Sequence, residues 1–146
     1  MPSSSGRSAP DRPIVPGAVF RLDPMHVVLP RREGAQPARE TRSVVVVSNK
    51  RDCRDDWCPT VIVLPLSAQL QHFNARHDVE IAQGDGGTDR DVMAQADLAH
   101  FILKSDLLSG ELRGVLLRDT QARIKVVLGN VLGIDVPAIT SPPTSE

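Results

Sequence analysis

The chain has few aromatic residues and no tyrosine. Its 146 residues include one tryptophan and three phenylalanines, which are Trp57, Phe20, Phe73 and Phe101. Proteins that bind single-stranded RNA across the face of a sheet stack the bases on several aromatic side chains. The low aromatic content therefore argues against a broad base-stacking platform.

Long apolar runs are also missing. No stretch approaches the roughly 18 to 20 apolar residues that a membrane-spanning helix needs, and Met1 to Pro16 lacks the apolar middle of a signal peptide. We therefore expect a cytoplasmic protein. The length predicts a single domain with a core of its own.

Cysteine is scarce, and its pattern does not favour a metal site. Cys53 and Cys58 are the only two cysteines, and in a reducing compartment such a pair is usually two free thiols. A structural zinc ion needs about four ligands, and the sequence holds no second cysteine pair. The sequence predicts neither a metal nor a cofactor.

The net charge is small, but it is unevenly distributed. Residues 1–50 hold eight Arg or Lys and four acidic residues, a net charge of +4, whereas residues 51–146 hold nine and fourteen, a net charge of −5. This distribution suits an anionic ligand that binds near the N-terminal third. A disordered basic N-terminal leader followed by a domain with no special charged site would give the same charge distribution.

The apolar pattern predicts short strands followed by one helix. Strands are expected at 18–22, 44–47, 60–66, 77–81 and 112–116, with one or two more within 92–103. Polar loops are expected at 25–40 and 49–59, a glycine-rich turn at 83–89, and a break at 107–110. Pro65 lacks a backbone donor, so we expect it at an edge, a bulge or a strand end.

The helix is predicted to begin with Asp119 as its N-cap and to end at Gly133. Apolar residues recur between them at three- and four-residue spacing, namely Ile124, Val127, Leu128, Val131 and Leu132. The sequence thus predicts a small antiparallel, barrel-like α+β domain at residues 16–134, mainly β, with a C-terminal helix. Residues 1–15 and 135–146 are expected to be a disordered leader and tail.

Arg42 is followed by Ser43 and then by four consecutive valines, Val44 to Val47. Such a β-branched run is typical of a buried strand, which places the arginine at the strand's mouth. A guanidinium is permanently charged and its planar fork of donors matches phosphate oxygens. Arg42 is therefore a candidate phosphate clamp, although a strand that simply emerges into water at this point gives the same pattern.

Three segments resemble the MazF/PemK family of toxin endoribonucleases. Residues 18–24 resemble the family's opening strand, residues 41–49 its Thr-Arg-Pro-Val-Val-Val-Val-Ser-Asn block, and residues 59–67 its Pro-Thr-Val-Ile-Val-Ala-Pro-Ile-Thr block. The likeness covers residues 16–134 and implies an SH3-like barrel. It also implies a homodimer, a cognate acidic antitoxin and single-stranded RNA as substrate, cleaved without a metal.

The resemblance assigns catalytic roles to Arg42, Ser67 and Asp97. Ser67 stands where the family has threonine, and Asp97 matches the acid of the family's Asp-Gln-Ile/Val/Pro-Arg-Thr block. Arg42 would stabilise charge on the phosphate, Ser67 would hydrogen-bond to it, and Asp97 or a nearby histidine would move protons. Further substrate contacts are expected from Arg31, Arg32, Arg39, Thr41 and His100.

This chain departs from the family pattern in several positions. The acid block reads Asp97-Leu98-Ala99-His100-Phe101, so histidine replaces the family's arginine, and Ser43 replaces the usual proline. Each candidate also has a structural interpretation: Ser67 as a turn residue, Asp97 as a cap or salt-bridge acid, His100 as a solvated side chain. A non-catalytic binding module, similar to relatives that inhibit DNA gyrase, or a degenerate antitoxin-binding remnant, is the alternative function.

Overall fold

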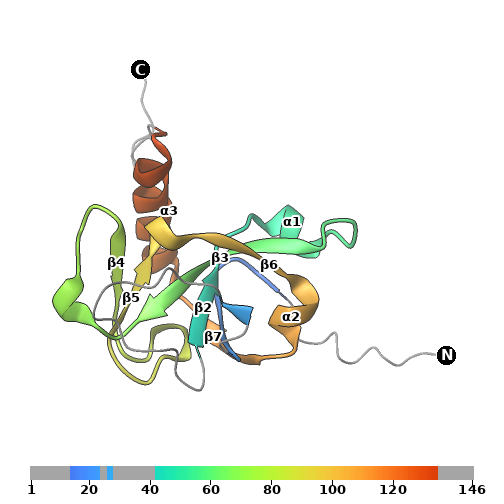
Figure 1. Cartoon of the computed structure of the whole chain (residues 1–146), viewed down its shortest axis with the longest axis horizontal. Coiled ribbons are helices and arrows are strands. Elements are labelled where there is room, and N and C mark those ends of the chain that lie inside the picture. The colour runs from blue at the N-terminus through green and yellow to red at the C-terminus, as the bar shows by residue number, and fades with distance from the viewer. Residues whose placement is uncertain (1–13, 24–25, 28–41, 135–146) are drawn as a thin grey trace.

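The computed structural model describes residues 14–23, 26–27 and 42–134. Seven strands occur in this part of the chain: β1 (Ala18–Leu22), β2 (Arg42–Val46), β3 (Thr60–Ser67), β4 (Asp78–Ile81), β5 (Val92–Gln95), β6 (His100–Leu103) and β7 (Glu111–Val115). They pair antiparallel in the order β4-β5-β3-β2-β1-β7, and β6 also pairs with β3. The predicted α+β, mainly β architecture with a C-terminal helix is confirmed (Figure 1).

The valine run of β2 is buried on both faces of the sheet. Val44 and Val46 belong to a first core with Phe20 and Leu22, whereas Val45 belongs to a second core. Because successive side chains of a strand point to opposite faces, a strand between two cores must be apolar at every position. This explains why the run shows no alternation of polar and apolar residues.

Pro65 lies inside a central strand rather than at the sheet's edge. β3 pairs through Thr60–Val63 with β6 and through Leu66–Ser67 with β5. Pro65 falls between these two ladders, and across the sheet it pairs with Val44 of β2. The change of partner explains how a residue without a backbone donor is accommodated there.

Two short helices lie in segments where the sequence indicated only a loop and a break. α1 (Lys50–Arg54) occupies the expected loop at 49–59, and the side chain of Asn49 caps it by accepting from the Asp52 N–H at 2.8 Å. α2 (Lys104–Leu108) runs into the expected break at 107–110, and its Leu107 is buried in the first core. Three 3₁₀ turns complete this part of the chain: η3 (Leu70–His72), η4 (Asp85–Gly87) and η5 (Ala96–Leu98).

The C-terminal helix α3 (Arg118–Leu132) does not use Asp119 as its N-cap. Leu117 is the cap residue, and its side chain makes no capping bond. Asp85 of η4 serves instead, accepting from the Leu117 N–H at 2.8 Å and from the Thr120 hydroxyl at 2.6 Å. The predicted end of the helix is confirmed, because Gly133 adopts the left-handed conformation, φ 77°, of a C-cap.

α3 packs against β4 and η5 through part of its apolar stripe. Ile124 is buried in the second core and Val127 and Leu128 are partly buried against it, but Leu132 near the helix end is exposed. In Figure 1 this end of α3 projects beyond the sheet. Among the described residues, no helix is long and apolar enough to span a bilayer.

Candidate active site

Arg42 is the first residue of β2 and lies half-buried at the strand's end. It pairs with Leu22 of β1. It is two residues before Val44, so strand alternation places its side chain on the face of the first core, where that core ends. The predicted position of the arginine, at the mouth of a buried strand, is confirmed.

Ser67 is the last residue of β3 and is also half-buried. Its Oγ accepts a hydrogen bond from the Gln69 N–H at 3.1 Å. A hydroxyl that accepts in this way still has its own hydrogen to donate. Ser67 therefore terminates the strand and keeps a donor for an anionic ligand.

Both residues end neighbouring strands at the same end of the β2–β3 pair. The ladder between the two strands runs through Val46–Val63, Val45–Leu64 and Val44–Pro65. Two further residues of the same register would bring Arg42 opposite Ser67, and directly opposite residues share a face of the sheet.

The same rung continues across two further strands. Ser67 pairs with Met93 of β5, and Met93 pairs with Glu80 of β4. We call Arg42, Ser67, Met93 and Glu80 the Arg42 row. Met93 is buried and Glu80 is exposed. The backbone of Glu80 lies two strand spacings, roughly 10 Å, from that of Ser67. The sequence did not indicate Met93 or Glu80, because nothing in it shows which strands become neighbours.

Asp97 does not lie in the Arg42 row. It belongs to η5, four residues beyond Met93, which corresponds to roughly 10 Å of backbone. Its Oδ2 forms an ion pair with His77 Nδ1 at 3.8 Å. The structure therefore brings Asp97 to His77 rather than to Ser67.

His100 is the first residue of β6 and is half-buried. It pairs with Val63, four residues before Ser67 along β3, a distance of roughly 13 Å in an extended strand. Its Nδ1 is 3.0 Å from the Leu98 carbonyl oxygen, so this nitrogen carries the proton. Nε2 is buried and has no hydrogen-bond partner among the described residues.

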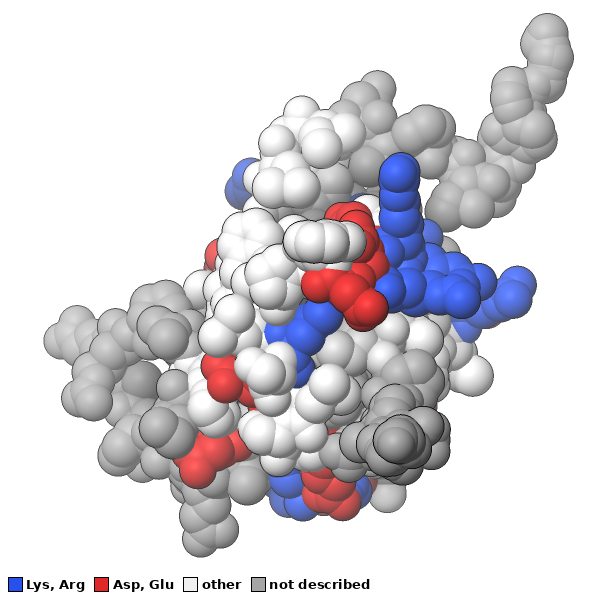
Figure 2. Space-filling view, turned by 90° about the vertical axis from the view of Figure 1, so that its right-hand side faces the viewer, with Lys and Arg blue, Asp and Glu red and all other residues white. Residues whose placement is uncertain are grey.

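Arg31, Arg32, Arg39 and Thr41 lie outside the described residues, so their expected contacts with substrate stay predictions. Figure 2 shows one face of the molecule, where basic and acidic side chains lie side by side. This face includes α1, whose exposed Lys50, Arg51 and Arg54 are followed by exposed acidic residues. The described part of this face therefore does not form a surface of one sign.

The fold defines a class of protein: a small antiparallel sheet with a C-terminal helix, in which Arg42 and Ser67 end neighbouring strands. A family model described as "PemK-like, MazF-like toxin of type II toxin-antitoxin system" matches residues 21–132. The chain belongs to this toxin family. Among curated proteins, none matches the chain in sequence.

Several solved structures share the fold. An endoribonuclease from a mycobacterial species is 20% identical, with a TM-score of 0.62, and the match covers 84% of this chain and 94% of that one. A mycobacterial endoribonuclease in complex with its cognate antitoxin is also 20% identical, with a TM-score of 0.59 and coverage of 84% and 96%. A MazE–MazF structure from Deinococcus radiodurans is 15% identical, with a TM-score of 0.60 and coverage of 83% and 96%.

Proposed function

We propose that this toxin is an endoribonuclease that cleaves single-stranded RNA without a metal ion, with Arg42 and Ser67 at the scissile phosphate. One observation supports the proposal: Arg42 and Ser67 end neighbouring strands at the same end of the sheet, where the register of β2 and β3, continued by two residues, would bring them opposite each other. Family membership and the endoribonuclease names of the similar structures support it.

The reaction needs little covalent chemistry from the protein. The ribose 2′-oxygen attacks the adjacent phosphorus and loses its proton, while the bond from phosphorus to the 5′-oxygen breaks and that oxygen gains a proton. The products carry a 2′,3′-cyclic phosphate and a 5′-hydroxyl. Charge on the phosphoryl oxygens grows in the transition state, and Arg42 is suited to stabilise it through its fork of donors.

Ser67 would donate its free hydrogen to a phosphoryl oxygen. An unassisted hydroxyl is a weak base, and a guanidinium does not lose its proton. Proton transfer by Asp97, which the resemblance implies, would require its carboxylate to leave the ion pair with His77. The proposal therefore rests on charge stabilisation and positioning and gives Asp97 no contact with the phosphate.

Substitution of the two residues tests the proposal. Arg42→Ala is expected to slow cleavage about 100- to 1000-fold and Ser67→Ala about 10- to 100-fold, because each removes a donor to the developing charge. Ser67→Thr, which restores the family's residue, should keep most of the activity. Rates are measured in EDTA on a long single-stranded RNA with variants whose circular dichroism matches the parent.

Arg90→Ala is the matched control. Arg90 is an exposed arginine whose ion pair, at 3.9 Å, is with its neighbour Asp89. Its removal takes away the same charge without changing the Arg42 row, so the rate should stay within twofold. Equal losses in Arg90→Ala and Arg42→Ala would show that general charge, rather than the site, supports cleavage.

The proposal also includes a homodimer and a cognate antitoxin with an acidic segment, since similar structures include antitoxin complexes. The second candidate function is a binding module without RNA chemistry. The buried Nε2 of His100 and the pairing of Asp97 with His77 favour it. Intact RNA after incubation with folded, antitoxin-free protein would decide for this second function.

A further inference from the structure

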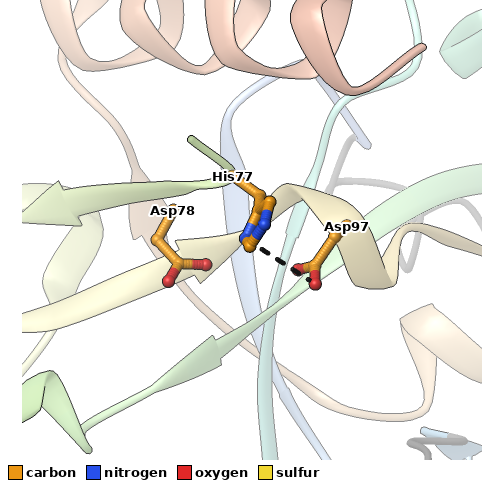
Figure 3. A group of neighbouring side chains, drawn as sticks. All are labelled: His77, Asp78 and Asp97. Carbon is orange, nitrogen blue, oxygen red and sulfur yellow. Dashed lines mark ion pairs between the residues drawn. The ribbon is translucent and has the colours of Figure 1, made fainter. Parts of the chain in front are cut away.

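Three side chains that can ligate a metal meet at the start of β4. His77 and Asp78 are neighbours in sequence, and Asp97 reaches them from η5. Their ligand atoms, one from each residue, all lie within 4.8 Å of one another. Figure 3 shows the His77 ring between the two carboxylates.

The backbone holds these residues in fixed relation. The Ala96 N–H donates to the His77 carbonyl oxygen at 2.8 Å, which ties η5 to the start of β4. Asp78 pairs with Gln95 across the β4–β5 ladder. α3 packs on both β4 and η5. The three ligand-bearing residues therefore belong to backbone segments that are held together by hydrogen bonds and packing.

The charges of the group favour a cation. Asp78 is only 6% exposed, and one of its oxygens accepts from the Asn74 N–H at 2.9 Å. Among the described residues, its carboxylate accepts no other hydrogen bond, and no lysine or arginine forms an ion pair with Asp78 or Asp97. A buried carboxylate is costly unless a cation or enough donors compensate it. Among the described residues, His77 is the one basic side chain in an ion pair with this group, and its ring is charged only when it is protonated.

We propose that His77, Asp78 and Asp97 bind one divalent first-row metal ion, such as Mn²⁺, with water completing its coordination. One imidazole nitrogen and two carboxylate oxygens suit this class of ion. Ligand atoms around such an ion are roughly 3 to 3.5 Å apart at bond lengths of about 2.1 Å, so small side-chain rotations would close the site. The sequence predicted no metal, because the three ligands meet only after the strands pair.

The proposal goes beyond the proposed function. The group lies at the start of β4 and on η5 and includes neither Arg42 nor Ser67, and the cleavage proposed above needs no metal ion. The bound ion would instead join η5 to β4 beneath α3 and stabilise the folded chain, since a ligand that binds only the native state raises its stability by mass action.

Mn²⁺ binding to the full chain, freed of any affinity tag, tests this site. Mn²⁺ is the probe because it prefers carboxylate and water oxygens to thiolates, so Cys53 and Cys58 do not compete. The loss of the free-ion electron paramagnetic resonance signal should give one ion per chain. His77→Gln and Asp97→Asn are each expected to weaken the affinity about tenfold or more.

His26→Gln is the matched control, because His26 forms a similar ion pair with Asp106, at 3.6 Å, but contributes to no such three-residue group among the described residues. Its affinity should equal that of the parent. Mn²⁺ should also raise the melting temperature of the parent and of His26→Gln, but not that of the other two variants. Equal binding in all four proteins, or none at millimolar Mn²⁺, would overturn the proposal.

Discussion

The two cysteines differ in their surroundings, although nothing in the sequence gives a reason to distinguish them. Cys53 lies on α1 and is buried, and its thiol donates to the Ser48 carbonyl oxygen at 3.6 Å. Burial raises the pKa of the Cys53 thiol; the nearby Lys104 charge opposes this effect, and Asp52 adds to it. Neither thiol forms a disulfide in the structure.

We expect iodoacetamide to alkylate Cys58 before Cys53 in the native protein. The thiolate is the reactive form, and a raised pKa lowers its fraction at any pH below that pKa. Alkylation of Cys53 should therefore keep accelerating to a higher pH than an ordinary thiol requires. Peptide mass spectrometry at successive times measures both rates. In denaturant the two cysteines should react alike, and faster native alkylation of Cys53 would contradict this account.

For the candidate site residues, the sequence predicts the position of each residue in its strand better than it predicts which residues come into contact. Arg42 and Ser67 stand at strand ends. The valine run after Arg42 and the family-like segment 59–67 indicate these positions in the sequence. The sequence contains four histidines, and nothing in it shows that His77 would meet Asp97. That contact depends on the register of β4 and β5, which is set by packing across the sheet.

At the scale of elements, the N-terminus of α3 depends on a residue about thirty positions earlier in the chain. Asp85 accepts from the Leu117 N–H and from the hydroxyl of Thr120, which is 1% exposed. This pair of bonds joins η4 to α3. The local candidate, Asp119, is instead an exposed residue of the first helical turn.

Asp85→Ala is expected to lower the free energy of unfolding by about 1–3 kcal/mol, because it leaves the N–H of the cap residue Leu117 and the buried Thr120 hydroxyl without their acceptor. Asp119→Ala should change it by less than about 0.5 kcal/mol, as for other exposed substitutions. Equilibrium unfolding in urea measures both values. A larger loss of unfolding free energy in Asp119→Ala than in Asp85→Ala would show that Asp119 caps the helix, as the sequence predicted.

The elements that the sequence missed are short. Strands are visible as β-branched or alternating runs, and α3 is visible because it shows more than one period of its apolar stripe. α1 and α2 have five residues each, too few to show a helical period. Asn49, with its side chain accepting from the Asp52 N–H, was the one local signal for α1.

At the scale of the whole molecule, apolar side chains remain uncovered in the described part of a single chain. Trp57 is 92% exposed, and Phe101 and Leu103 on the same face of β6 are exposed as well. Leu117, Leu132 and Ile134 add further exposed apolar surface. Phe101 and Leu103 are neighbours on one strand face, and exposed apolar surface larger than scattered single residues usually marks an interface.

We expect a homodimer in solution. Light scattering on the purified chain should give twice the 15.8 kDa of one chain at micromolar concentration. Because an apolar interface is not screened by salt, the dimer should persist at high ionic strength. A mass of one chain at every concentration would contradict the expectation.

The central claim is that the chain cleaves RNA through 2′-hydroxyl attack at a phosphate held by Arg42 and Ser67. The most direct measurement is incubation of the folded, antitoxin-free protein with a long single-stranded RNA in EDTA, followed by mapping of the product ends. We expect discrete cuts that leave 5′-hydroxyl ends. Intact RNA, or cuts that leave 5′-phosphates, would contradict the central claim.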